Sequence, residues 1–294
     1  MHQSARLRAL LADDRPLLSV GVYDCFSAKI GEHAGFPVLS ISGNALTASL
    51  LGLPDLGLIT MTEVVNQARN IANSVEAPVL ADGDTGYGNA LNAMRAVRDF
   101  EAAGIAGLSL EDQVFPKRSS TIGKPGIIPI PEMVTKLKAA CDARRSDDFV
   151  IIGRTDSRSV EGLDGAIERA VRYCDAGVDM IFINSLESAE EMRKVTRAVP
   201  KPVKINVVEG HPPSRFTSAE LFGFGFKLVG YAGILQRCAG KAMLACLETF
   251  RKEDTTEGSL KAMLMTPAER YAVLGVAKYR ELEAKLFGTG SKSP

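Results

Sequence analysis

The sequence has no net charge, no long apolar run and no secretion signal, and each absence excludes a class of protein. Lysine plus arginine and aspartate plus glutamate each number 35 among the 294 residues, so no long-range field favours nucleic acid or an anionic membrane. No uncharged apolar run approaches the roughly 18 residues of a membrane span. The start, MHQSARLRALLADDRP, lacks the apolar core of a signal peptide. We therefore expect a globular protein of the cytoplasm.

Cysteine and histidine are too few and too scattered for a zinc site. The chain has no C-x-x-C pair and no histidine cluster, which argues against structural zinc. Free, buried thiols in a reducing compartment are the expected state of the five cysteines, which are Cys25, Cys141, Cys174, Cys238 and Cys246.

Short apolar runs alternate with amphipathic stretches of helix length. Eight runs are predicted to be strands, at Leu17–Val22, Pro37–Ser42, Pro78–Asp82, Gly107–Glu111, Phe149–Arg154, Asp179–Ile183, Pro202–Val207 and Phe226–Gly230. Several helical stretches end in Ala-Gly, where glycine suits the left-handed residue that closes a helix. This alternation implies a parallel sheet covered by helices, and eight units indicate a TIM (β/α)8 barrel in the α/β class.

The alternative is a doubly wound open sheet, but its G-x-G-x-x-G signature is missing after the first strand. We expect the barrel to occupy residues 1–254 and a helical extension to occupy residues 255–294, with an extra helix or a helical pair over Pro267–Ala284. The extension is expected to dock on a partner subunit.

Polar residues follow the predicted strands, where a barrel carries its chemistry. The stretch ADGDTGYG places Asp82 and Asp84 directly after the third strand, and Glu111 ends the fourth. Three acids on adjacent strand ends repel one another unless a cation neutralises them. Their hard oxygen atoms suit Mg²⁺, or Mn²⁺ as the alternative. The glycines between them allow a sharp turn and close approach of a ligand.

Other strand ends carry candidate site residues for which the sequence leaves two roles open. Ser42-Gly43-Asn44 is either a plain loop or a set of N–H donors for an anion. Asp24 caps a helix or serves the site. Arg154 follows the apolar run Val150–Gly153, so it requires an acid or an anionic substrate as its partner.

Four segments occur in this order along the chain: GVYDCFSAKIGEHAGFPVLSISG, LPDLGLITMTE, ADGDTGYGNALNAMRAVRDFEAAGIAGLSLEDQVFPKR and IIGRTDSR. Together they resemble the isocitrate lyase/phosphoenolpyruvate mutase superfamily across about residues 15–245. The resemblance implies a TIM barrel, a homotetramer that swaps its C-terminal helix, bound Mg²⁺, and a small 2-oxo or 2-hydroxy acid as substrate. The reaction would pass through an enolate or a metaphosphate-like species.

The resemblance also implies roles for individual residues. Asp82 would contact the metal directly, and Asp55, Asp84 and Glu111 would support it, mostly through water. The resemblance further implies a gating loop of Lys117, Arg118, Ser119 and Ser120. Asn206 and Tyr231 are added because they follow the seventh and eighth predicted strands. The candidate substrate-binding residues are therefore Ser42, Gly43, Asn44, Asp82, Arg154 and Asn206, and the candidate catalytic residues are Lys117, Arg154, Glu111 and Tyr231.

Departures from the family pattern decide the subclass. Isocitrate and 2-methylisocitrate lyases carry K-[KR]-C-G-H in the gate, whereas this chain has Ser119 in place of the acidic thiol. Asn184 stands where the lyases have a glutamate. The chain is therefore most similar to the cysteine-lacking, oxaloacetate decarboxylase-like branch. That branch has a histidine after the eighth strand, where this chain has Tyr231, and His211 either reaches the pocket or lies on the surface.

Three alternatives to an oxaloacetate-type decarboxylase stay open. One is a lyase that cleaves (methyl)isocitrate or dimethylmalate with another acid, such as Tyr231 or water. Another is a phosphonopyruvate or phosphoenolpyruvate phosphoryl-transfer enzyme. The last is a non-catalytic barrel that only binds an oxoacid.

Overall fold

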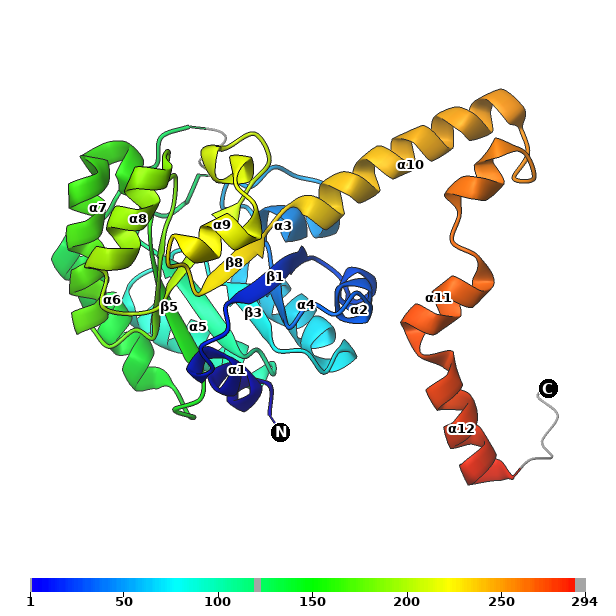
Figure 1. Cartoon of the computed structure of the whole chain (residues 1–294). Helices are drawn as coiled ribbons and strands as arrows, with labels where there is room; N and C mark the ends of the chain where they lie inside the picture. Colours follow the sequence, from blue (N-terminus) through cyan, green and yellow to red (C-terminus); the bar gives the residue numbers. More distant parts are fainter. Residues whose placement is uncertain (1, 119–122, 289–294) are drawn as a thin grey trace. The chain divides into compact units, whose positions relative to one another are not determined.

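A computed structural model describes residues 2–118 and 123–288 (Figure 1). The chain forms two compact units, Met1–Gln236 and Arg237–Pro294. In the first unit, eight parallel strands pair in chain order and close into a barrel. The strands are β1 (Leu17–Val22), β2 (Val38–Ile41), β3 (Val79–Asp82), β4 (Gly107–Glu111), β5 (Val150–Thr155), β6 (Met180–Ile183), β7 (Val203–Val207) and β8 (Leu228–Tyr231).

The predicted TIM barrel is confirmed, and all eight predicted strands are present with ends shifted by two residues or fewer. The helices of the first unit are α1 (Gln3–Ala12), α2 (Cys25–His33), α3 (Gly43–Leu51), α4 (Met61–Ser74), α5 (Ala90–Ala102), α6 (Ile130–Ala143), α7 (Arg158–Asp175, interrupted at Gly162), α8 (Ala189–Ala198), the 3-10 turn η1 (Pro212–Arg215), α9 (Ser218–Gly223) and the start of α10 (Ile234–Glu253).

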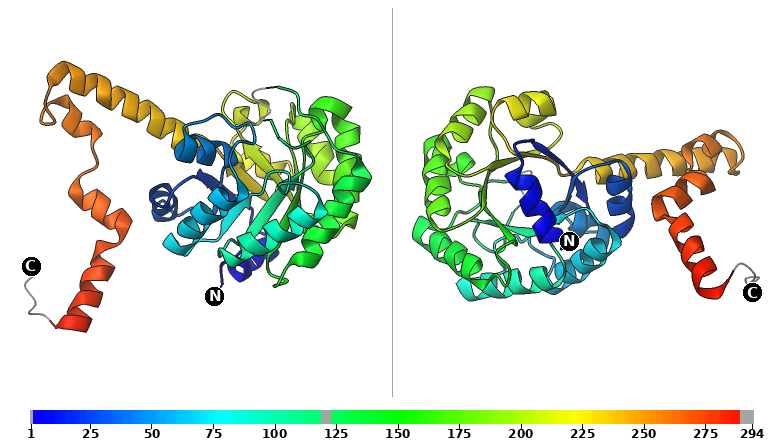
Figure 2. Two further views of the ribbon diagram at one scale, coloured as in Figure 1. Left: turned by 180° about the vertical axis from the view of Figure 1, so that it is seen from behind. Right: turned by 60° about the horizontal axis from the view of Figure 1, so that its bottom comes forward.

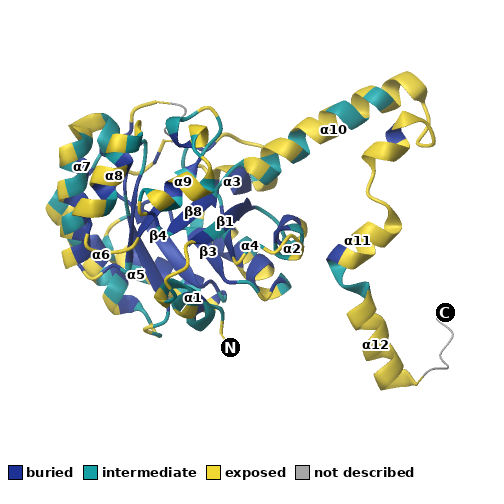
Figure 3. Ribbon diagram, in the orientation of Figure 1, coloured by how far each residue is buried: buried dark blue, intermediate teal, exposed yellow. Residues whose placement is uncertain are grey.

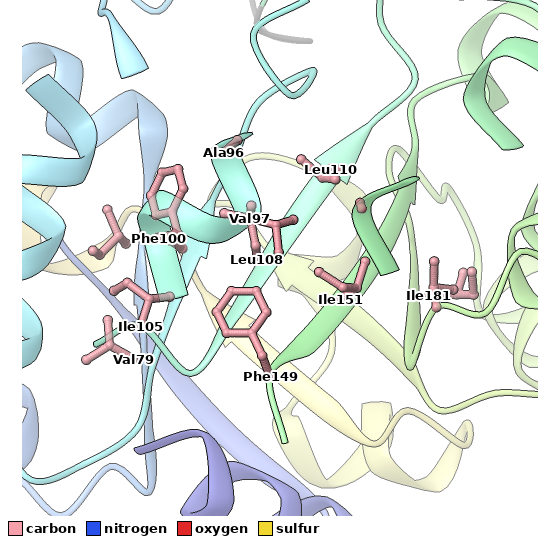
Figure 4. Packing of buried hydrophobic residues seen from close by; sticks show 14 of the residues in the cluster. Val79, Ala96, Val97, Phe100, Ile105, Leu108, Leu110, Phe149, Ile151 and Ile181 are labelled. Atoms are coloured by element: carbon pink, nitrogen blue, oxygen red, sulfur yellow. The ribbon is translucent and has the colours of Figure 1, made fainter. Parts of the chain in front are cut away.

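The main core lies between the outer face of the barrel and the surrounding helices. Figure 4 shows this layer around β4, where Val97 and Phe100 of α5 pack near Leu108, and Phe149 and Ile151 pack beside them. Most strand residues are buried, and the helices α2 to α9 around the barrel expose mainly their outer faces (Figure 3). Burial on both faces explains the nearly continuous apolar runs that predicted the strands.

The amino-terminal end of the barrel is closed by α1, which crosses it in the right-hand view of Figure 2. Leu7 of α1 is fully buried against inward side chains of the strands. These side chains form an apolar cluster of Leu17, Val38, Leu80, Val150, Ile152, Met180, Phe182 and Leu228. Because this end is sealed, ligands reach the barrel interior from the carboxyl ends of the strands.

The second unit contains the remainder of α10, the 3-10 turn η2 (Ser259–Met263), α11 (Pro267–Leu274) and α12 (Val276–Phe287). Of the two arrangements expected over Pro267–Ala284, the structure has the helical pair, because Gly275 adopts a left-handed conformation with φ 68° and separates α11 from α12. The boundary expected at residue 254 coincides with the end of α10, whereas the division into compact units falls near its start.

Two expectations drawn from composition can be compared with the structure. All five cysteines are free, but only Cys174 is buried and Cys238 is exposed, so the expectation of five buried thiols is wrong. Among the described residues, no helix has the length and apolar character that crossing a membrane requires.

Candidate active site

The acids of ADGDTGYG lie at the carboxyl end of β3. Asp82 is the last residue of the strand, and its Oδ1 accepts a hydrogen bond from the Asp84 backbone N–H at 3.1 Å. Asp84 has a positive φ of 48°. A Cβ added at Gly83 would lie 2.8 Å from the Leu108 side chain and 2.9 Å from the Ser109 carbonyl oxygen. Glycine is therefore required for this turn to pack against β4.

Lys117 of the gating loop lies inside the acid cluster rather than on the surface. Its side chain is 4% exposed, and its Nζ lies 2.6 Å from Asp84 Oδ1 and 3.2 Å from Asp55 Oδ1. Asp82 Oδ2 lies 4.0 Å from the same Nζ. The gate thus inserts a positive charge among three acids that the sequence predicted as metal ligands.

Arg154, near the end of β5, neutralises the other side of the cluster. Its Nη1 lies 2.9 Å from Glu111 Oε2 and 3.8 Å from Asp82 Oδ2, and its Nε lies 3.0 Å from Asp156 Oδ2. The requirement for an acidic partner is confirmed. One guanidinium therefore joins the ends of β3, β4 and β5.

Burial and mutual attraction shift the pKa values of these groups strongly. Burial raises the pKa of Glu111 well above its usual range and that of Asp84 to about 6. Burial also disfavours the charged form of Asp82, but Lys117 and Arg154 outweigh it, so the pKa of Asp82 is lowered. Despite burial, the surrounding acids raise the pKa of Lys117 well above its ordinary value. The cluster therefore holds its two cations firmly charged.

The donor set fits a hydrated divalent cation. No group of three His, Cys, Asp or Glu side chains in residues 2–118 and 123–288 is arranged to hold a metal by itself, but Mg²⁺ is usually held by one or two carboxylates and keeps several waters. Asp55 Oδ1 and both oxygens of Glu111 are buried and accept no well-directed hydrogen bond, although Lys117 and Arg154 lie close to them. Hard oxygen atoms therefore remain available beside Asp82.

Ser42, Gly43 and Asn44 form a helix start rather than a plain loop. Ser42 caps α3 by accepting a hydrogen bond from Ala45 N–H at 3.4 Å. A Cβ added at Gly43 would lie 3.1 Å from Asp82 Oδ2 and 3.3 Å from Lys117 Nζ, so the first turn of α3 borders the acid cluster. Helix N-termini present free N–H groups to anions, which fits the predicted substrate contacts.

A cavity of about 50 Å³ lies next to this cluster and extends into the barrel. Its lining includes five predicted site residues, which are Ser42, Asp82, Arg154, Asn206 and Tyr231. No cysteine or histidine belongs to that lining. His211 precedes η1 outside the cavity, and Asp24 caps α2 with its carboxylate on Ser27 N–H at 2.6 Å.

A hydrogen-bonded chain that the sequence did not predict connects the gate to Arg154. Gln113 Oε1 accepts from the Arg118 backbone N–H at 2.9 Å, and Gln113 Nε2 donates to Asp156 Oδ2 at 3.2 Å. Asn184 also donates to Asp156. The position of Gln113, two residues after Glu111, was the available signal. Ser119 and Ser120 lie outside the described residues.

The fold and the site together define a TIM-barrel enzyme with an acidic centre at the carboxyl ends of its strands. The chain belongs to the phosphoenolpyruvate phosphomutase family, whose model matches residues 7–251, and so to the isocitrate lyase/phosphoenolpyruvate mutase superfamily. The resemblance noted from sequence motifs is thereby confirmed.

Three similar proteins show the range of chemistry within the superfamily. The chain is 40% identical to 2,3-dimethylmalate lyase of Eubacterium barkeri, over 99% of this chain and 100% of that protein. It superposes with a TM-score of 0.91 on oxaloacetate acetylhydrolase in complex with 3,3-difluorooxalacetate (29% identity, 99% of each chain). For phosphonopyruvate hydrolase in complex with oxalate and Mg²⁺ the TM-score is 0.87 (28% identity, 97% of this chain and 99% of that one).

Proposed function

We propose that the protein is a Mg²⁺-dependent carbon–carbon lyase acting on a small 2-oxo or 2-hydroxy dicarboxylate, and that it decarboxylates a 2-oxo substrate of the oxaloacetate type through an enolate. One observation carries this proposal. Acids from β3 and β4, together with Lys117 and Arg154, surround the mouth of a cavity whose lining has neither thiol nor imidazole. Decarboxylation suits such a site, since CO₂ departs without a proton and solvent can protonate the enolate.

Each residue of the site has a role in this reaction. Asp82 would hold the cation, with Asp84, Asp55 and Glu111 supporting it. When bound, Mg²⁺ would supply Lewis-acid stabilisation of the negative charge that develops on the 2-oxo oxygen. The N–H groups of Gly43 and Asn44 and the hydroxyl of Ser42 would bind the C1 carboxylate.

Two cations and one phenol complete the assignment. Arg154 orients a carboxylate, because its guanidinium is fixed by Glu111 and Asp156. Lys117 lies beside Gly43 and can neutralise the bound acid while the gate excludes water. Tyr231 lines the cavity at the end of β8, where its hydroxyl would serve as a proton donor or a substrate contact.

A second candidate is cleavage of a substituted malate. The 40% identity to 2,3-dimethylmalate lyase over whole chains favours it. Such a cleavage releases a carboxylate carbanion that must be protonated on the enzyme. Tyr231 is the candidate acid, because the cavity lining offers neither cysteine nor histidine.

A substrate panel with Mg²⁺ tests the proposal. Pyruvate formed from oxaloacetate supports decarboxylation, whereas a 2-oxoacid plus a second acid formed from 2,3-dimethylmalate or 2-methylisocitrate supports the second candidate. Phosphate released from phosphonopyruvate would identify a phosphonate enzyme. Tight oxalate binding without turnover of any substrate would identify a non-catalytic oxoacid-binding protein.

We infer a homotetramer in which the C-terminal extension is swapped between subunits. The second unit exposes a series of large apolar side chains, including Met243, Leu244, Leu247, Phe250, Tyr279, Leu282, Leu286 and Phe287. Apolar surface of this extent is typical of a protein interface. Light scattering after size-exclusion chromatography should give four times the monomer mass of 31.5 kDa, and a monomeric protein would contradict the inference.

A further inference from the structure

The barrel interior beneath the acid cluster contains a polar layer. Inward side chains of β1, β2, β4 and β7 line the cavity there, and they are Ser19, Ser40, Ser109, Lys204 and Asn206. Bulky aliphatic residues usually fill this part of a TIM barrel, as they do nearer α1 in this protein. The polar layer therefore requires a separate explanation.

Lys204 is the charged member of the layer and has no anionic partner. The residue is 7% exposed. Its Nζ lies 5.4 Å from the centre of the Phe182 ring, and Arg154 lies 5.2 Å from the same ring. Within the described residues, no carboxylate oxygen lies within 4.0 Å of Lys204 Nζ, and the ammonium donates no hydrogen bond. An unpaired buried cation is costly.

The neighbours of Lys204 supply hydrogen-bond donors and leave space. Ser109 Oγ is buried without a hydrogen-bond partner, and the hydroxyls of Ser19 and Ser40 lie 3.3 Å apart. Gly230 of β8 pairs with Ser19 and Asn206, and a Cβ added there would lie 2.9 Å from Ser19 Oγ and 3.7 Å from Lys204 Cε. The absence of a side chain at Gly230 keeps this part of the interior open.

The cavity has the size and charge for one anionic group. A single water needs roughly 10–15 Å³ of such space, so about 50 Å³ holds three or four heavy atoms, which is a carboxylate and the carbon that bears it. Burial and Arg154 lower the pKa of Lys204 to about 8 against the attraction of Asp82, so the ammonium is still mostly charged at pH 7.

We propose that Lys204 is a specificity-determining residue that binds the distal carboxylate of a dicarboxylate substrate, with the hydroxyls of Ser109 and Ser19 as additional donors. This proposal rests on the proposed function, which places the 2-oxo acid end of the same molecule at Asp82 and the start of α3. The distal arm then extends down the barrel axis into the polar layer. A monocarboxylate such as pyruvate would leave Lys204 unpaired, so the site selects diacids.

Calorimetric titration in the presence of Mg²⁺ tests the proposal with two ligands. Oxalate mimics only the 2-oxo acid end, whereas 3,3-difluorooxaloacetate also carries a distal carboxylate. In Lys204→Met, affinity for difluorooxaloacetate should fall about 10- to 100-fold, as expected for one lost charge-assisted hydrogen bond, while oxalate binding stays within about threefold. Lys138→Met, at an exposed lysine on α6, should change neither. Lys204→Gln provides the same test if the methionine variant does not fold.

Each contrary outcome has a distinct meaning. Equal weakening of both ligands would show that Lys204 acts through the acid cluster, and unchanged binding of both would show that it is only a core residue. Either result overturns this inference and leaves the proposed function standing. Failure of the native protein to bind either ligand with Mg²⁺ would overturn both.

Discussion

Two buried lysines lie in neighbouring regions of the barrel and have opposite electrostatic surroundings. Lys117 is 4% exposed, with three aspartates within 4.0 Å of its ammonium. Lys204 is 7% exposed, its Nζ lies 5.4 Å from the centre of the Phe182 ring, and no carboxylate among the described residues forms an ion pair with it. The pKa of Lys117 is raised well above its ordinary value, and that of Lys204 is lowered to about 8.

The difference shows that burial alone does not determine the charge of a lysine. Burial opposes the ammonium at both positions, and only the carboxylates around Lys117 reverse its effect. Lys117 is therefore a counter-ion for groups that the protein supplies, whereas Lys204 lacks a counter-ion that a ligand would supply. The five substitutions below test this contrast and the site around it, from the largest expected effect to the smallest.

Asp82→Asn should have the largest effect, because Asp82 is the acid that acts on both lysines. Loss of the proposed direct metal ligand should lower Mg²⁺-dependent kcat by about a thousandfold, or about 4 kcal/mol at 1.36 kcal/mol per tenfold. Circular dichroism should show an intact fold, because the carboxylate serves the cation and not the core. Full activity at saturating Mg²⁺ would remove Asp82 from the metal site.

Lys204→Met should stabilise the ligand-free protein at pH 7. Each pKa unit corresponds to about 1.36 kcal/mol, so a pKa lowered from 10.5 to about 8 corresponds to at most about 3 kcal/mol of native-state destabilisation. Since a domain of this size shifts by roughly 2–4 °C per kcal/mol, the melting temperature should rise by several degrees. A saturating dicarboxylate should narrow this gap, because it stabilises only the native lysine.

The pH dependence of this stability gap has a defined sign. Below pH 8 Lys204 is protonated in both states, so the destabilisation is fully present. Between pH 8 and 10.5 the unfolded chain binds the proton and the folded chain does not, so native stability rises with pH. The advantage of Lys204→Met over native protein should therefore shrink toward pH 10. A gap that is constant with pH would contradict the buried, unpaired ammonium, and Lys138→Met serves as the exposed control.

Periodicity and strand-end chemistry predicted the barrel and its acids because these depend on local sequence. Eight apolar runs predicted eight strands, and a parallel barrel places the residues at their ends on one rim. Asp82, Glu111 and Arg154 could therefore be assigned before any contact was known. The sequence left a single helix and a helical pair open over Pro267–Ala284, because one glycine in an amphipathic stretch is compatible with either.

Side-chain direction was the part that the sequence could not supply. In the sequence, Lys117 is a basic residue of a loop, and only the structure shows that its ammonium forms ion pairs with Asp84 and Asp55. Lys204 and Asn206 are two residues apart on β7, so their side chains lie on the same face of the strand. The sequence pattern alone does not say that this face is the barrel interior. The role of Gln113 depends on contacts with two separate segments.

Lys117→Met should lower kcat/KM by about 10- to 100-fold, since one charge-assisted contact to the substrate is worth roughly 1.5–3 kcal/mol. Unlike Lys204→Met, it should also tighten Mg²⁺ binding measured by calorimetry, because it removes a positive charge from among the metal-binding acids. Lys124→Met, at an exposed lysine later in the same loop, is the matched control. An unchanged Mg²⁺ affinity would contradict the competition between Lys117 and the cation.

Ser119→Cys tests whether the gating loop has lost a catalytic acid. Ser119 itself lies outside the described residues. If the protein is a lyase that lost its acid, the restored thiol should raise cleavage of 2-methylisocitrate or 2,3-dimethylmalate above background. If it is a decarboxylase, oxaloacetate turnover should stay largely intact and no lyase activity should appear. Strong lyase turnover by the native protein would overturn the assignment of Ser119 as a poor replacement for the thiol.

Gln113→Met should have the smallest effect, because Gln113 holds the gate and Arg154 in position without touching the substrate. The substitution leaves the Arg118 N–H and one oxygen of Asp156 without this partner. The bond from the Arg118 N–H is neutral and worth about 1 kcal/mol, and Asp156 Oδ2 keeps Arg154 as its partner, so kcat/KM should fall about five- to tenfold. Mg²⁺ affinity should not change, because Lys117 and the acids keep their contacts.

Gln67→Met, at a half-buried glutamine on α4 with one long hydrogen bond of 3.5 Å, is the matched control and should leave kcat/KM unchanged. A loss confined to Mg²⁺ affinity would show that Gln113 acts on Lys117, whereas a loss confined to kcat/KM would show that it acts through Asp156 on Arg154.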